Sequence, residues 1–386
     1  MMNSCLPLAG KLLLKNLQNG FSNKNIVLSP LLLSAMAAMV GAGCSGRSQR
    51  RVLSFVGSNN LDEFKSRISD AMSSIAASCC SGDQQGGPKI SFANGVWVDK
   101  RFPLKPSFQQ CVRDAFKAEA KNVDFSNQAD EAVEEINSWV ESQTNGLISG
   151  VLDSQKHIDP LTALVLGNAL YFKGYWKNKF NPKRTEERDF YLLDGNKISV
   201  PFMTSSCSYL YGSFDNFKAL EIPYQSGKQD EKHFSMQFLL PNAKDGLQNL
   251  LEQFNADSYG LINRHNFQLT RTEFKDFWIP KFKFSYNLGN IKFPFMEEPM
   301  ELTEMVHLES GEHPVISNIV QKAVIEVDEQ GTEAAAFTRF DIFGAPPTLE
   351  EKLESFVADH PFMFIIKQQK TGLIFFAGAV LNPHLD

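Results

Sequence analysis

Histidines are the side chains of this sequence best suited to acid–base chemistry or metal binding, and their spacing supports neither. The chain has seven, and they show no zinc-ligand spacing. Two of them share an acidic stretch with three glutamates: His307, His313, Glu304, Glu309 and Glu312. A solvated polar loop accounts for such a stretch better than a metal site does. We therefore expect neither a metal nor a cofactor.

The sequence also lacks the local motifs of enzymes that use nucleophilic or phosphoryl-transfer catalysis. The sequence contains no G-x-S-x-G elbow, no Walker loop and no kinase motif set. A triad built from residues far apart in the chain stays open, because its members need not be neighbours in sequence.

Residues 41–46, with the sequence GAGCSG, match the G-x-G-x-x-G pattern of dinucleotide-binding loops. In those loops the pattern follows a strand and opens a helix, so that backbone amides hold a pyrophosphate. Here the preceding residues 31–40 are rich in Leu, Ala and Met, which favours a helix. We interpret the glycines as a turn that ends this helix.

Residues 328–347 (DEQGTEAAAFTRFDIFGAPP) have an unusual pattern of small side chains. A short Ala-rich helix followed by a proline-terminated loop is one interpretation. With a period of two, one face instead carries only small residues: Thr332, Ala334, Ala336 and Thr338. A strand with such a face could enter a tight space between two existing strands. The residues alone do not decide between these alternatives.

The elements around this segment are predicted from hydrophobic periodicity. We expect helices at 5–15, 31–40, 61–77, 106–121, 130–142 and 247–254, and a loop at 81–88. We expect strands at 90–98, 163–172, 217–223, 234–241, 277–284 and 323–327, and a terminal hairpin from 362–367 and 373–380. A helix-rich start that leads into several buried strands indicates an α+β fold.

The composition is that of an ordinary globular protein, with 43% hydrophobic and 21% charged residues. The 386 residues could form two or three domains, but no linker or internal repeat divides them, so we expect a single domain over residues 1–386. The 32 phenylalanines predict a large aromatic core. The net charge of −6, without a basic run, argues against a nucleic-acid partner.

The apolar segments do not predict export or membrane insertion. Lys11 and Lys15 interrupt the N-terminal run, which has no positive leader, and residues 26–40 are too short to span a membrane. The six cysteines have no regular spacing, and the chain has no Asn-x-Ser/Thr acceptor. We expect free thiols and a cytoplasmic or nucleocytoplasmic location, with extracellular release as an open alternative.

Several motifs together resemble one protein family. They are NIVLSP at 25–30, LGNALYFKGYW at 166–176, GTEAAA at 331–336, FVADHPF at 356–362 and the closing residues 375–383. The chain is similar to the serpins over essentially its whole length. Residues 92–99, 192–196, 202–203 and 356–360 are most similar to those of plant serpins.

The resemblance implies three β-sheets, eight or nine helices and an exposed reactive-centre loop at about 332–356. It also implies suicide inhibition of a serine or papain-like cysteine endopeptidase by a monomer that catalyses nothing itself. The target cleaves a bait bond and forms an acyl-enzyme, and the cut loop then inserts into a sheet and distorts the target. The implied hinge residues are Glu329, Gly331, Thr332, Glu333, Ala334, Ala335, Ala336 and Thr338.

Alignment to the family places the bait bond at Ala345–Pro346. A proline after the scissile bond restricts the backbone, which makes a poor substrate for most serine proteases, and no basic residue precedes the bond. Gly344–Ala345 is an alternative that would suit a papain-like enzyme, with Phe343 one residue upstream. Phe343–Gly344 would suit a chymotrypsin-like enzyme.

The resemblance also implies a polar cluster, the shutter, beneath the sheet that opens. Ser29 and Asn168 match this cluster, whereas Leu32 and Gln321 replace a serine and a histidine that are usual there. Gln321 can donate and accept hydrogen bonds but cannot carry a charge. The segment 285–303 is also several residues shorter than the corresponding segment of the family. These departures keep an alternative to the inhibitory function open, namely a non-inhibitory serpin that acts as a binding or storage protein.

Overall fold

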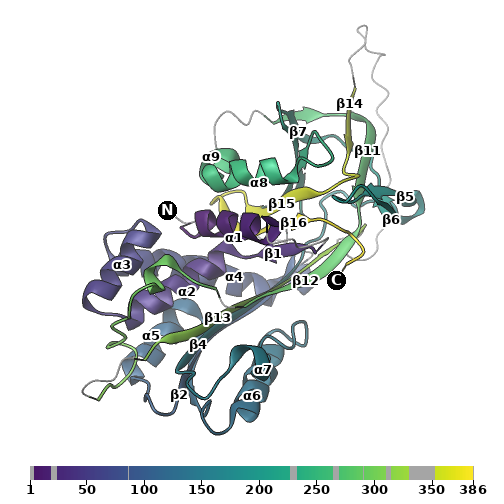
Figure 1. The fold of residues 1–386 in the computed structure, drawn as a ribbon. Coiled ribbons are helices and arrows are strands. Elements are labelled where there is room, and N and C mark those ends of the chain that lie inside the picture. The colour runs from purple at the N-terminus through teal and green to yellow at the C-terminus, as the bar shows by residue number, and fades with distance from the viewer. Residues whose placement is uncertain are drawn as a thin grey trace.

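The computed structural model describes residues 4–18, 24–85, 87–226, 233–263, 269–289, 291–309, 314–329 and 353–385. These residues form nine α-helices and three β-sheets (Figure 1). The helices are α1 Leu6–Gln18, α2 Pro30–Gly43, α3 Gly46–Val56, α4 Leu61–Gln85, α5 Pro106–Phe116, α6 Ala129–Gln143, α7 Ser154–His157, α8 Leu247–Ala256 and α9 Ser258–Asn263. Two 3₁₀ turns are η1 Pro182–Arg184 and η2 Pro294–Met296.

The strands divide among sheets of five, four and seven strands, each named below in its spatial order. The five-stranded sheet contains β12 Phe282–Leu288, β13 Ile316–Val327, β4 Leu164–Lys173, β2 Lys89–Asp99 and β3 Ala118–Val123. The four-stranded sheet contains β14 Glu354–Val357, β11 Phe274–Pro280, β6 Lys197–Met203 and β5 Glu186–Tyr191. The seven-stranded sheet contains β1 Ile26–Leu28, β16 Leu373–Val380, β15 Phe362–Gln368, β9 Phe234–Pro241, β8 Phe217–Pro223, β7 Tyr209–Ser213 and β10 Thr270–Thr272.

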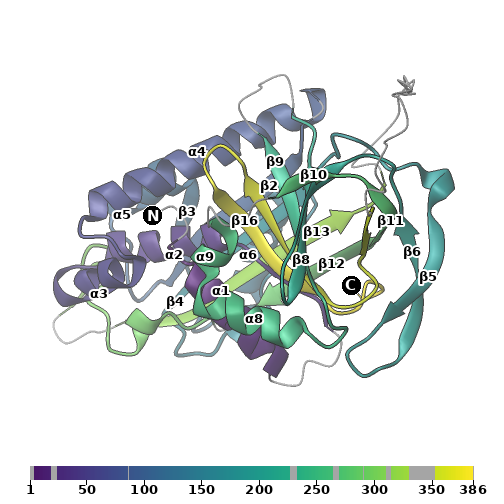
Figure 2. The same ribbon diagram turned by 90° about the horizontal axis from the view of Figure 1, so that it is seen from above.

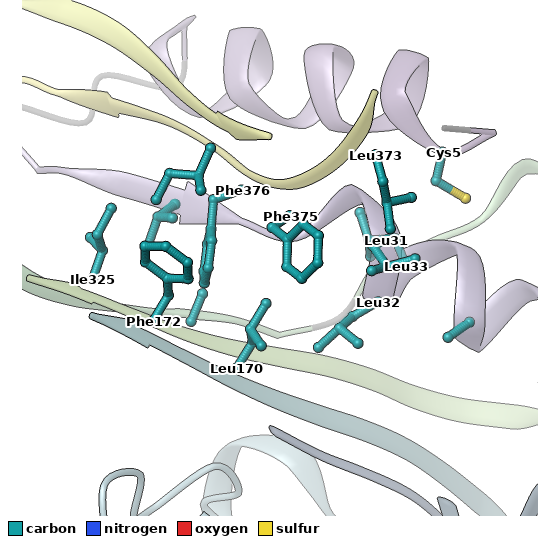
Figure 3. Packing of buried hydrophobic residues seen from close by; sticks show 14 of the residues in the cluster. Cys5, Leu31, Leu32, Leu33, Leu170, Phe172, Ile325, Leu373, Phe375 and Phe376 are labelled. Atoms are coloured by element: carbon teal, nitrogen blue, oxygen red, sulfur yellow. The ribbon is translucent and has the colours of Figure 1, made fainter. Parts of the chain in front are cut away.

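The inner face of the five-stranded sheet packs on the seven-stranded sheet and on α2. Leu170, Phe172 and Ile325 point toward Phe375 and Phe376 of β16, as Figure 3 shows. The rings of Phe172 and Phe376 meet edge to face at 5.9 Å. Helix α2 is buried on nearly all sides, which explains why its sequence has no polar face.

The outer face of the five-stranded sheet is covered by α6 and α7, which lie on the side opposite α2 (Figure 1). Trp97 of β2 lies flat over Gly95 and Gly167, where a Cβ would come within 3 Å of its ring. Trp139 of α6 then packs edge to face on Trp97 at 5.5 Å. Both faces of β4 are therefore buried, which explains its nearly continuous hydrophobic run.

Of the remaining helices, α4 and α5 contact β2 and β3 of the five-stranded sheet, and α1 and α8 pack on the seven-stranded sheet. Helices α1 and α8 are side by side and cover one face of the seven-stranded sheet, as Figures 1 and 2 show. Among the described residues no helix is long and apolar enough to cross a membrane.

Most predicted elements are confirmed, including the C-terminal hairpin, in which β15 and β16 pair antiparallel. The turn at residues 41–46 is also confirmed, since α2 ends at Gly43 and a helix, not a strand, precedes the glycines. The predicted strand at 323–327 is the end of the longer strand β13.

Three predicted boundaries are wrong. The helix expected at 106–121 ends at Phe116, where Lys117 adopts a left-handed φ of 50°, and β3 follows. The strand expected at 277–284 is two strands in different sheets, because Pro280 cannot donate a ladder hydrogen bond. Helix α4 continues to Gln85 through the start of the loop expected at 81–88. The apolar contacts of the earlier turns of α4 offset the low helix propensity of Ser81 and Gly82.

Candidate functional site

The centre of the site is a seam between two parallel strands. β13 and β4 are neighbours in the five-stranded sheet, with pairs from Ile316↔Leu164 to Ile325↔Phe172. Parallel pairing is slightly weaker per residue than antiparallel pairing. Residues 330–352, whose sequence contains the small-residue pattern, begin two residues beyond the end of β13, after Asp328 and Glu329. A strand that entered the seam from that end would run antiparallel to both of its neighbours.

The predicted hinge and bait residues lie mostly outside the described residues. These are Gly331, Thr332, Glu333, Ala334, Ala335, Ala336, Thr338, Phe343, Gly344, Ala345 and Pro346. Of the predicted hinge residues, only Glu329 is described. The predicted loop boundary at 356 is wrong, because Glu354–Val357 forms β14, which pairs in parallel with β11.

The predicted shutter residues come together where the N-terminus of α2 meets the seam. Gln321 Oε1 accepts a hydrogen bond from the Ser29 N–H at 2.7 Å, and Gln321 Nε2 donates to the Ser29 carbonyl at 3.3 Å. Asn168 Nδ2 donates to the Leu32 carbonyl at 3.1 Å. The Ser29 hydroxyl caps α2 by accepting from the Leu32 N–H at 3.3 Å. Both strands of the seam are thus fastened to the first turn of α2.

A third amide extends this polar row. Asn94 of β2 is in register with Asn168, which is in register with Gln321. Asn94 Nδ2 donates to the Phe116 carbonyl at 3.0 Å. Within the described part of the chain, Asn94 Oδ1 and Asn168 Oδ1 are buried without a hydrogen-bond partner. Sequence reasoning did not identify Asn94, although it lies in the matched segment 92–99.

A charged cluster closes the end of the seam at which Ile325 pairs with Phe172. Lys173 of β4 pairs with Glu326 of β13 at 2.6 Å and with Asp328 at 3.4 Å. The Trp176 indole N–H donates to the Asp328 carbonyl at 2.8 Å. The cluster therefore ties the end of β13 to β4 and its following loop. Lys173 and Trp176 lie in the motif at 166–176, but their partners are about 150 residues away and have no local signal.

Glu329 anchors the start of the segment that leaves the sheet. Its carboxylate pairs with Lys281 at 2.8 Å and accepts from the Thr185 hydroxyl at 2.7 Å. Its carbonyl accepts from the Phe180 N–H at 3.0 Å. Burial alone would raise the pKa of Glu329, but the hydrogen bonds from Lys281 and Thr185 outweigh it and hold the pKa below its ordinary value of 4.5.

No group of three or more His, Cys, Asp or Glu side chains in the described ranges is placed to hold a metal. His313 and Glu312, from the acidic stretch that also contains His307, lie outside those ranges.

Comparison with known proteins decides the family. The family model described as serpin, serine protease inhibitor, matches residues 8–383. This chain belongs to the serpin family. It is 40% identical to Serpin-ZX of Arabidopsis thaliana, over 94% of this chain and 93% of that protein. It is 39% identical to Serpin-ZXA of Oryza sativa subsp. japonica, over 95% and 92% of the two chains.

A solved structure extends the similarity to the whole fold. The native stressed conformation of Arabidopsis AtSerpin1 matches with a TM-score of 0.86 and 36% identity, over 99% of this chain and 98% of that one. The expected serpin fold is confirmed: the described residues form three sheets and nine α-helices, where eight or nine helices were expected. As a serpin, the chain is a protease inhibitor whose targets are proteases in general, and it is most similar to plant members.

Replacing Glu329 by glutamine is expected to lower the free energy of unfolding of this serpin by about 1–3 kcal/mol at pH 7, since the charge-assisted hydrogen bonds are lost. Because the folded pKa of Glu329 is depressed, its stabilisation is complete above about pH 4.5 and disappears as the pH falls through the folded value. Urea unfolding at pH 7, 5 and 4 measures this. The exposed Glu186 of β5 supplies the control, Glu186→Gln. A difference between wild type and Glu329→Gln that stayed constant with pH would contradict the account.

Proposed function

We propose that this serpin inhibits an endopeptidase by inserting its cleaved reactive loop between β4 and β13. The target's serine or cysteine attacks the carbonyl carbon of the bait bond and forms an ester or thioester, and the proton of the nucleophile passes to the departing amine. The peptide bond breaks, and the new amino group leaves with the C-terminal part of the serpin. The N-terminal part of the loop then enters the seam and carries the acylated protease with it.

The observation that carries the proposal is the parallel seam, since a segment with a small-residue pattern begins two residues beyond the end of β13. A strand inserted there replaces one parallel ladder by two antiparallel ladders, so backbone hydrogen bonds are gained. Residues 332–345 would span about 47 Å as a strand at about 3.4 Å per residue. Since β4 has ten residues, this length would carry the acylated residue past its far end.

The hinge assignments belong to this proposal. Thr332, Ala334, Ala336 and Thr338 would face the core beneath the seam, where Leu166 and Ala323 are buried. Glu329 would be the point about which the segment turns, because it is the last described residue fastened to the four-stranded side. Of the bait bonds, Gly344–Ala345 and Phe343–Gly344 avoid the proline that follows Ala345.

The remaining expectations are also proposals. This serpin acts as a monomer, forms a covalent complex with its target and catalyses no reaction of its own. Four described cysteines carry free thiols: Cys5, Cys44, Cys111 and Cys207. Free thiols support a reducing location, cytoplasmic or nucleocytoplasmic.

Cleavage of the loop is expected to raise the unfolding temperature by more than about 20 °C, because the cleaved chain gains a central strand with two new ladders. Differential scanning calorimetry before and after limited proteolysis within residues 332–346 measures this. Cleavage within the N-terminal stretch before α1 supplies a control that should not stabilise the fold. An unchanged unfolding temperature after loop cleavage would support the non-inhibitory alternative.

A further inference from the structure

A pocket lies where the start of β14 meets the edge of the seven-stranded sheet. Its volume is about 270 Å³, and it is bounded by β7 and the residue that follows it, by β10, and by the first residue of β14. Figure 1 shows β7 and β14 at the same end of the molecule. The proposed hinge and shutter do not contribute to it. The lining includes Tyr211, Ser213, Phe214, Thr270, Thr272 and Glu354.

Glu354 is the only charged residue of this lining. Its carboxylate accepts a hydrogen bond from the Tyr211 hydroxyl at 3.2 Å. Within the part of the chain that the structure describes, no lysine, arginine or histidine forms an ion pair with Glu354. Burial raises the pKa of Tyr211 above its ordinary value of 10.0, so the hydroxyl stays a donor at neutral pH. The pocket therefore carries one negative charge, and a carboxylate can accept several hydrogen bonds besides this one.

Contacts with both sheets hold this carboxylate in place. The Tyr211 ring packs edge to face on Phe274 at 5.3 Å and on Phe356 at 6.4 Å. Lys218 Nζ donates to the Ser355 carbonyl at 3.1 Å, which fastens β14 to β8 of the seven-stranded sheet. The carboxylate and its donor thus come from two sheets that are fixed to each other, so the pocket is formed before any ligand arrives.

The chemistry of the lining fits a guanidinium group. Arginine presents five N–H donors in one plane, and the lining offers the Glu354 carboxylate together with hydroxyl oxygens of Ser213, Thr270 and Thr272. Phe214 adds an aromatic wall, and cations bind favourably over aromatic rings. Glu354 would repel an anion, and an apolar side chain would leave its carboxylate desolvated without a partner.

The place of the pocket identifies the source of the arginine. Glu354 follows Ala345 by nine residues, a length of chain that spans at most about 32 Å. A globular endopeptidase of about 220 residues has a radius of gyration of about 17 Å, and hence a diameter of about 44 Å. A protease on the bait bond is therefore within reach of the pocket. We propose that the pocket receives an arginine side chain of the target endopeptidase before the loop inserts.

This proposal rests on the proposed inhibitory function and adds a second contact with the same target. Insertion carries the acylated residue toward the far end of β4, so the contact exists only in the first complex. Its loss should slow association of the two proteins. It should leave unchanged the moles of serpin consumed per mole of protease inhibited, because that ratio is decided after acylation.

A binding experiment with Glu354→Gln tests the pocket itself. The probe is N-acetyl-arginine methylamide, followed by the NMR signals of the ¹³C-labelled methyl groups of Thr270 and Thr272. The control is Glu273→Gln, since Glu273 is an exposed carboxylate one residue beyond Thr272 and outside the lining. We expect saturable shifts in wild type and in the control, and at least fivefold weaker binding in Glu354→Gln. Equal affinity in Glu354→Gln, or equal shifts from the uncharged N-acetyl-norleucine methylamide, would overturn the site.

A kinetic experiment tests the protease as the occupant. We expect Glu354→Gln to associate at least fivefold more slowly than wild type with whichever of papain and chymotrypsin forms a covalent complex, at an unchanged consumption of serpin. Glu273→Gln should stay within twofold of wild type. Equal association rates of Glu354→Gln and wild type would overturn the protease as the occupant. If wild type forms no covalent complex with either enzyme, the insertion mechanism is contradicted, and the arginine probe still decides the pocket.

Discussion

Ala334→Arg is expected to convert this serpin from an inhibitor of its target into a substrate. On the period-two pattern, residue 334 faces the core when the loop enters the seam, beneath which Leu166, Leu170 and Ile319 are fully buried. A guanidinium placed there without a partner is strongly unfavourable. The rate of loop insertion should fall below the rate of hydrolysis of the acyl-enzyme. We expect at least a tenfold rise in the moles of serpin consumed per mole of protease inhibited.

Ala335→Arg is the matched control, since it places the same side chain on the opposite face of the same strand. Titration of active protease against each variant, with a denaturing gel for the covalent complex, measures both. Ala335→Arg should retain most of the wild-type complex, and Ala334→Arg should give mainly cleaved serpin. Equal loss in both variants would contradict the assignment of faces, and equal retention would contradict insertion of this segment.

Joint replacement of Ala345 by arginine and Pro346 by serine is expected to create an inhibitor of trypsin. Trypsin-like proteases require a basic residue before the bond they cleave. The proline ring restricts the backbone on both sides of the Ala345–Pro346 bond and hinders attack there. We expect the association rate with trypsin to rise at least a hundredfold over wild type.

Ala345→Arg alone, with Pro346 retained, separates the two effects. It should remain close to wild type against trypsin, because the bond is still followed by proline. Stopped-flow loss of trypsin activity gives the rates, and mass spectrometry of the released peptide gives the cleaved bond. A single variant as fast as the double variant would show that Pro346 does not limit the bait bond. If the double variant forms no covalent complex, the assignment of the bait bond to the bond after residue 345 is wrong.

The sequence predicted the fold through patterns that act locally. The nearly continuous apolar run of β4 follows from burial on both faces. The polar residues Ser29, Asn168 and Gln321, whose clustering was implied by the resemblance to serpins and not by a local pattern, do meet at one point. Errors arose where one residue ends an element. Lys117 stops α5 with a left-handed backbone, and Pro280 divides β11 from β12.

The parts of the site that the sequence did not reveal depend on contacts between distant residues. Asn94 completes the shutter row only because β2 lies beside β4 in a particular register. Lys322 is one charged residue in a strand, and its sequence context does not show that its ammonium meets the carbonyls of Ser149 and Gly150. Trp176 and Asp328 likewise meet only after the five-stranded sheet has formed.

Incubation with papain and, separately, with chymotrypsin tests the central claim most directly. The products are resolved on a denaturing gel, and the released peptide is identified by mass spectrometry. We expect a serpin–protease band that resists boiling, together with a peptide that begins at Ala345 for papain or at Gly344 for chymotrypsin. Cleavage at these bonds without such a band, from either protease, would contradict inhibition by loop insertion and favour a non-inhibitory serpin.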